Sequence, residues 1–107
     1  MYLMKKQVLF IQGGGDDGYK ADANMVASLQ SALGNSYDLN YPQMQTDESA
    51  PDFGRLKQIG KEIARIKGDV ILVGHSLGAS LLLKYLSENK VKKKISDTKK
   101  YSRTAGT

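Results

Sequence analysis

Short apolar runs alternate with longer segments of helical periodicity along most of the chain. One of the runs, Val70-Ile71-Leu72-Val73, is wholly apolar, as expected for a strand that is covered on both faces. The longer segments place apolar residues every three or four positions, which is typical of helices that bury one side. The expected strands lie at 7–11, 36–41 and 69–73, and the expected helices at 22–33, 52–67 and 77–89. We expect Asp22 to be the N-cap of the first helix.

This order of strand and helix, repeated three times, predicts an α/β fold. Parallel strands need crossover connections, and right-handed crossovers place helices on both faces of the sheet. We therefore expect three layers, α/β/α, around a parallel sheet. The segment 42–51 is polar and begins and ends with proline, so we expect a solvated loop there, with Asp52 as the N-cap of the helix that follows.

The net charge of +5 is concentrated at the C-terminal end. Residues 1–89 hold nine Lys or Arg and ten Asp or Glu, whereas residues 90–107 hold seven Lys or Arg and one Asp. The apolar pattern also stops near Lys94. We therefore divide the chain into a folded part, residues 1–90, and a basic tail, residues 91–107, which we expect to be disordered or an aberrant, frameshifted end. A solvated tail explains the charge, and no nucleic-acid partner is expected.

The remaining composition points to no cofactor and no metal. The chain has no cysteine, which excludes disulfides and thiolate ligands, and no spacing of His and acidic residues suggests a metal site. The apolar run near the N-terminus, Val8-Leu9-Phe10-Ile11, is too short for a signal sequence or a membrane span. We expect a cytoplasmic protein without a membrane partner.

The most informative motif is Gly74-His75-Ser76-Leu77-Gly78, a G-x-S-x-G match between a strand and a helix. In that context a serine occupies a sharp, strained turn that exposes its hydroxyl as a nucleophile. Gly74 and Gly78 are expected at the turn because side chains there would crowd the helix and the neighbouring strand. The competing interpretation makes Ser76 an ordinary helix N-cap.

His75 is the only histidine in the chain. Because it precedes Ser76 directly at a sharp turn, the two side chains should diverge. We therefore expect His75 to be a partly buried packing residue beside the turn, and not the base that would deprotonate Ser76.

A glycine-rich segment, Gln12-Gly13-Gly14-Gly15, follows the first strand. Acyl transfer needs N–H donors aimed at a developing oxyanion. With a G-x-S-x-G turn, one donor is the N–H of the residue after the nucleophile, Leu77, and the other comes from a loop after an adjacent strand. We expect Gly14 to supply it, with Gly13 next; the alternative is a flexible turn.

The same loop also matches G-x-G-x-x-G through Gly13, Gly15 and Gly18, and Asp38 follows twenty residues later. This spacing occurs in dinucleotide-binding βαβ units. Two aspartates after Gly15 would repel a pyrophosphate, and Asp38 lies early in its strand, where a ribose-binding acid is not expected. A nucleotide-binding βαβ module remains an alternative.

The chain resembles the α/β-hydrolases, and most of all the compact serine hydrolases of the retinoblastoma-binding-protein-9 type and small predicted esterases. The resemblance covers roughly residues 6–90 and rests on the glycine loop, the Pro51-Asp52-Phe53 stretch that opens a helix, and the G-x-S-x-G turn. It implies an incomplete α/β-hydrolase fold with strand order second-first-third. It further implies Ser76 as the nucleophile toward a small ester-like substrate, and an oxyanion hole from Gly14 and Leu77. Many members have His-Gly where this chain has Gln12-Gly13.

In this family the triad acid and base follow the nucleophile along the chain. After Glu88 this sequence contains one acid, Asp97, and no histidine. We therefore expect a serine hydrolase that is impaired, with the strand at 69–73 left at an uncovered edge of the sheet. Such an edge also allows a non-catalytic fragment that pairs with a partner or with itself.

Overall fold

The computed structural model describes residues 6–14, 17–52, 54–89 and 95–101. The strands are β1 (Lys6–Ile11), β2 (Tyr37–Asn40), β3 (Val70–His75) and β4 (Ile95–Tyr101). The helices are α1 (Gly18–Ala21), α2 (Ala23–Leu33), the 3-10 turn η1 (Gly34–Ser36), α3 (Arg55–Arg65) and α4 (Leu77–Glu88).

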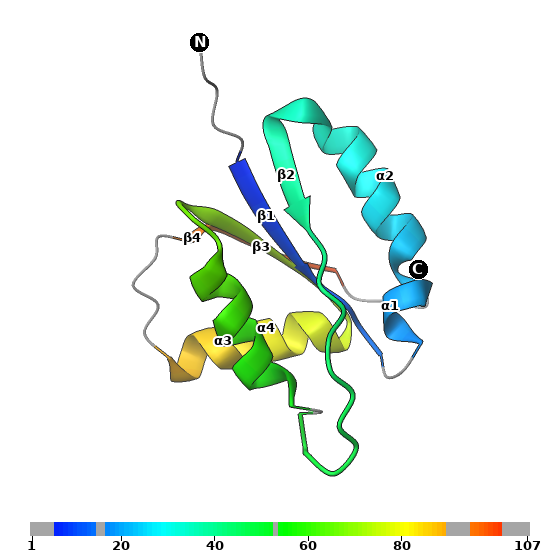
Figure 1. Cartoon of the computed structure of the whole chain (residues 1–107), viewed down its shortest axis with the longest axis vertical. Coiled ribbons are helices and arrows are strands. Elements are labelled where there is room, and N and C mark those ends of the chain that lie inside the picture. The colour runs from blue at the N-terminus through cyan, green and yellow to red at the C-terminus, as the bar shows by residue number, and fades with distance from the viewer. Residues whose placement is uncertain (1–5, 15–16, 53, 90–94, 102–107) are drawn as a thin grey trace.

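The strands form one parallel sheet in the order β2-β1-β3-β4. In the central pairs Val8 lies opposite Leu39 of β2 and Ile71 of β3. The expected order of the first three strands is confirmed, and each strand is connected to the next one in the sequence by a segment that contains a helix (Figure 1).

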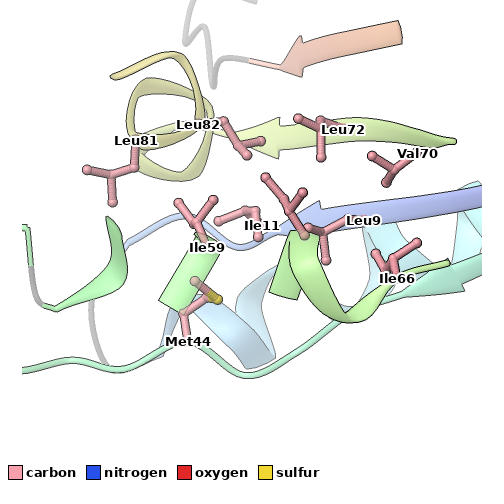
Figure 2. Close-up of a cluster of buried hydrophobic side chains, with 10 residues drawn as sticks. Leu9, Ile11, Met44, Ile59, Ile66, Val70, Leu72, Leu81 and Leu82 are labelled. Atoms are coloured by element: carbon pink, nitrogen blue, oxygen red, sulfur yellow. The ribbon is translucent and has the colours of Figure 1, made fainter. Parts of the chain in front are cut away.

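Helices cover both faces of this sheet, which confirms the α/β fold. Because successive side chains of a strand point to opposite faces, β1 and β3 each contribute to two cores. One core lies under α2 and holds Val8, Phe10 and Val73. The larger core lies between the sheet and the pair α3 and α4, as Figure 2 shows. Its buried residues are Leu9, Ile11, Met44, Ile59, Ile63, Ile66, Val70, Leu72, Leu81 and Leu82.

Helix α3 starts three residues later than the periodicity suggested, and Gly54, not Asp52, occupies its N-cap position. The Asp52 side chain nevertheless caps the first turn from two residues earlier. The Asp52 carboxylate accepts the N–H groups of Leu56 (2.9 Å) and Gly54 (3.0 Å). These hydrogen bonds lower the pKa of the Asp52 carboxyl, since they favour its charged form. Gly54, with φ of +75°, supplies the bend between this cap and the first turn of α3.

The edge of β3 is paired, so our expectation of an uncovered edge there was wrong. Strand β4, which lies within the segment expected to be a disordered tail, runs parallel to β3 and places Lys100 opposite Gly74. A register shift between Val70 and Ile71 interrupts the ladder. The physical reason is that a long apolar strand presents a full row of backbone donors and acceptors, which even a polar segment can satisfy. Tail residues 91–94 and 102–107 lie outside the described residues.

Candidate active site

Ser76 lies at the sharp turn that joins β3 to α4. Its backbone angles are φ 54° and ψ −118°, and no other non-glycine residue in the described part of the chain has a positive φ. Such a conformation costs an L-residue about 1–3 kcal/mol, so the surrounding packing must hold it in place. The Ser76 side chain is exposed.

The Ser76 hydroxyl does not act as a helix cap. Ser76 occupies the N-cap position of α4, but its side chain makes no capping hydrogen bond. Its backbone carbonyl alone joins the helix, accepting the N–H groups of Ala79 (3.0 Å) and Ser80 (3.2 Å). The ordinary N-cap interpretation therefore does not account for a serine at this strained position.

The two glycines that flank Ser76 allow α4 to begin directly on top of the sheet. A Cβ at Gly74 would lie 2.6 Å from the backbone of Ala79. A Cβ at Gly78 would lie 2.2 Å from the carbonyl oxygen of Ile11 and 2.4 Å from that of Gln12. Both separations are shorter than real Cβ atoms show, so any side chain would push the helix away from β1 or from its own turn.

The glycine loop packs directly against the Ser76 turn. Strands β1 and β3 are parallel neighbours with Ile11 opposite Gly74, so the segments that follow them leave the sheet at the same end. A Cβ at Gly13 would lie 2.6 Å from the His75 carbonyl oxygen and 3.1 Å from Ser76 Cβ. The fold thus places the loop next to the serine, although the two lie far apart in the sequence.

The hydrogen bonds distinguish between the two candidate oxyanion donors of this loop. The Gly13 N–H donates to Asp22 Oδ2 at 2.8 Å, so it is already used. Gly14 is exposed with φ of +60°, and its N–H has no acceptor among the residues that the structure describes. The N–H of Leu77 lies in the first turn of α4, where no acceptor exists within the helix. Gly14 and Leu77 are therefore the available pair, and Gly15 lies outside the described residues.

His75 is buried beside the turn, as expected for a packing residue. Its Nδ1 lies 3.0 Å from Asp22 Oδ1, and no hydrogen bond joins the two atoms. No hydrogen bond joins His75 to Ser76 in the described part of the chain. This geometry does not give Ser76 a base.

The residue that sequence reasoning missed is Asp22. Its position before a helix suggested an N-cap, yet its side chain makes no cap bond to α2. It is instead 4% exposed. One carboxylate oxygen accepts the N–H of the glycine loop, and the other lies against the His75 ring. Only the three-dimensional path of the chain reveals these contacts, because no local pattern distinguishes this aspartate from a capping one.

Two tyrosines stack close to Asp22. The rings of Tyr19 and Tyr41 are 4.3 Å apart and nearly parallel, and each hydroxyl donates to the other residue's carbonyl. Burial, with smaller contributions from Asp22 and Tyr19, raises the pKa of Tyr41 to about 12. Tyr41 therefore keeps its proton at neutral pH and does not replace the missing base.

Gln12 fixes the other side of the glycine loop. Its side chain is 1% exposed, and its Oε1 accepts the N–H of Met44 at 2.8 Å. This bond ties the end of β1 to the segment between β2 and α3. Gln12 therefore has a structural role.

The structure does not support a dinucleotide site. Asp38 lies opposite Gln7, near the start of β1, whereas the glycine loop follows Ile11. Ile11 lies four positions after Gln7 along the strand, which is about 13 Å. A carboxylate at that end of the sheet cannot hold the ribose of a nucleotide whose phosphates lie at the loop.

The described residues contain no group of three or more His, Cys, Asp or Glu side chains that could hold a metal ion. None of the helices that the structure describes is long and apolar enough to cross a membrane. Comparisons with protein-family models, with curated proteins and with solved structures each gave no match. The candidate site is thus defined by its residues and their geometry: an exposed, strained serine, two flanking glycines and a glycine loop packed on the turn.

Proposed function

We propose that this chain carries the nucleophile and oxyanion part of a serine-hydrolase site on an incomplete α/β-hydrolase fold. Its substrate would be a small ester-like molecule, and the absence of cysteine fits a cytoplasmic site of action. The observation that carries the proposal is the backbone of Ser76. It adopts a costly conformation and gains no capping bond from it, while Ser76 is exposed and the glycine loop packs against its turn.

The chemistry follows from these groups. The Ser76 oxygen attacks the ester carbonyl, and the hydroxyl proton must leave as the new C–O bond forms. The Gly14 and Leu77 N–H groups stabilise the resulting oxyanion. Collapse of this intermediate expels the alcohol and leaves an acyl-serine, which water then hydrolyses. Among the described residues no side chain is hydrogen-bonded to the Ser76 hydroxyl, and the single histidine lies against Asp22, so the proposal includes no base that accepts the proton. Turnover by this chain is therefore expected to be slow.

The missing base suggests a direct test by chemical rescue. Imidazole in solution supplies a general base, so hydrolysis of p-nitrophenyl acetate by the chain should increase with imidazole concentration. Imidazole also cleaves this ester without protein, so the relevant quantity is the rate above that of the Ser76→Ala variant. Ser80→Ala, which changes an exposed serine one turn along α4, is the matched control and should behave like the unmodified chain.

The proposal is contradicted if the unmodified chain and Ser76→Ala hydrolyse the ester at equal rates at every imidazole concentration. Robust turnover without imidazole that is lost in Ser76→Ala would support the nucleophile but refute the missing base. A triad nucleophile without its partners retains part of its rate acceleration through the oxyanion hole and binding, so a Ser76-dependent signal is expected to be measurable.

A further inference from the structure

A buried carboxylate connects the glycine loop to the Ser76 turn. Asp22 is 4% exposed. Its Oδ2 accepts the Gly13 N–H at 2.8 Å, and its Oδ1 lies 3.0 Å from His75 Nδ1. One side chain on the segment between α1 and α2 thus contacts both halves of the candidate site.

Gly13 contacts neighbouring segments of the backbone and the Asp22 side chain. Beyond the bond from its N–H to Asp22, its carbonyl oxygen would lie 1.7 Å from a Cβ at Gly18, so the two backbones are packed as closely as glycine permits. On the remaining side the loop meets the His75 carbonyl and Ser76 Cβ. Since Gly14 is the next residue, fixing the Gly13 peptide limits where the Gly14 N–H can lie.

Neither helix capping nor ion pairing accounts for the burial of Asp22. The side chain makes no cap bond to α2. No Lys or Arg of the described residues pairs with it, and it contacts the Gly13 N–H and the His75 imidazole. A carboxylate in such a place is unfavourable unless its hydrogen bonds and charge contacts compensate for lost hydration. Its contacts are to the two segments that must be aligned for acyl transfer.

We propose that Asp22 is a positioning residue, which holds the glycine loop against the Ser76 turn so that the Gly14 and Leu77 donors flank the serine oxygen. This inference rests on the proposed function. It assigns Asp22 no contact with substrate: the carboxylate acts through the Gly13 peptide on one side and through His75 on the other.

Phenylboronic acid tests this role without requiring a catalytic base. The serine oxygen adds to boron, the hydroxyl proton passes to the buffer, and the tetrahedral boronate anion mimics the oxyanion intermediate. Binding is followed by NMR, through the amide signals of Gly14 and Leu77. The chain should bind the boronic acid more tightly than Ser76→Ala does, because transition-state analogues depend on the groups that stabilise the intermediate.

Asp22→Ala should weaken boronate binding about tenfold or more, since small misplacement of a catalytic group is costly. Asp22→Asn keeps an oxygen that can accept the Gly13 N–H, so its affinity should stay within about threefold of the unmodified chain. The matched control is Asp69→Ala, which removes an exposed carboxylate next to the opposite end of β3 and should leave affinity unchanged. In Asp22→Ala the Gly13 amide should also exchange with solvent faster, while amides of β1 do not.

The outcomes separate the two proposals. If the unmodified chain binds phenylboronic acid no better than Ser76→Ala, the proposed function fails, and the positioning role fails with it. If the unmodified chain binds but Asp22→Ala binds equally well, the function stands and the positioning role is wrong. If Asp22→Ala does not fold, the Asn variant decides: affinity and Gly13 exchange close to those of the unmodified chain support the role, and loss of binding with unchanged Gly13 exchange overturns it.

Discussion

Replacing Ser76 by glycine should stabilise this protein, although it removes the proposed nucleophile. At φ 54° and ψ −118° a residue with a Cβ is strained by about 1–3 kcal/mol, and glycine is not. The opposing term is the greater freedom of glycine in the unfolded chain, about 0.5–1 kcal/mol relative to alanine. The side chain is exposed and makes no cap bond, so little else is lost. Ser76→Gly should therefore exceed Ser76→Ala in stability by roughly 0.5–2 kcal/mol.

Urea unfolding followed by circular dichroism measures this difference, and thermal unfolding should show it as a shift of about 4–8 °C per kcal/mol. The control is the same pair of substitutions at Ser80, which lies inside α4. There glycine should be less stable than alanine by about 1 kcal/mol, because helical angles suit alanine. If Ser76→Gly is no more stable than Ser76→Ala, the turn is not strained, and the reasoning that separates Ser76 from an ordinary cap is refuted.

Two further predictions concern stability. Gly78→Ala should destabilise the fold by about 1–3 kcal/mol or more in urea unfolding, because its Cβ would meet the Ile11 carbonyl oxygen. The control is Gly34→Ala, which should cost less because only φ is unfavourable there and no atom lies within 4 Å. Equal losses of stability in the two variants would contradict the packing argument. Hydrogen bonds from Leu56 and Gly54 lower the pKa of Asp52, so its contribution is present above the unfolded pKa of about 3.9 and is lost as pH falls through the folded value. Asp52→Asn should therefore flatten the decrease in stability on the acid side, and an unchanged pH profile between the two chains would exclude this contribution.

The regular elements could be predicted from sequence because they depend on local periodicity and on strong turn residues. Gly34 and Gly68, both with positive φ, end the segments that the periodicity assigned to helices. The apolar run of β3 predicted a strand buried on both faces, and Leu72 is buried in the core on one face while Val73 is buried in the core on the other. Strand β4 escaped prediction since a segment rich in lysine shows no apolar alternation, and its pairing depends on the neighbouring β3 edge.

The candidate site likewise has one part that the sequence predicts and one part that it does not. The turn around Ser76 could be predicted, because a strained serine between two close-packed glycines is specified by five consecutive residues. The sequence already favoured Gly14 over Gly13 as the donor, but the hydrogen bond that occupies the Gly13 N–H is accepted by Asp22, a residue whose local sequence indicated only a helix cap. Contacts of this kind join segments that the sequence keeps apart, so periodicity and short motifs carry no information about them.

The central claim is that Ser76 is presented as an acyl acceptor, and the most direct measurement is the site of acylation. The chain is treated with p-nitrophenyl acetate in the presence of imidazole, quenched in acid, digested and mapped by mass spectrometry, in parallel with Ser76→Ala. We predict that the acetyl group is found on Ser76 above the labelling of any other serine, and that the corresponding peptide of the variant is unlabelled. Equal acetylation of Ser76 and of the exposed Ser80 would contradict the account.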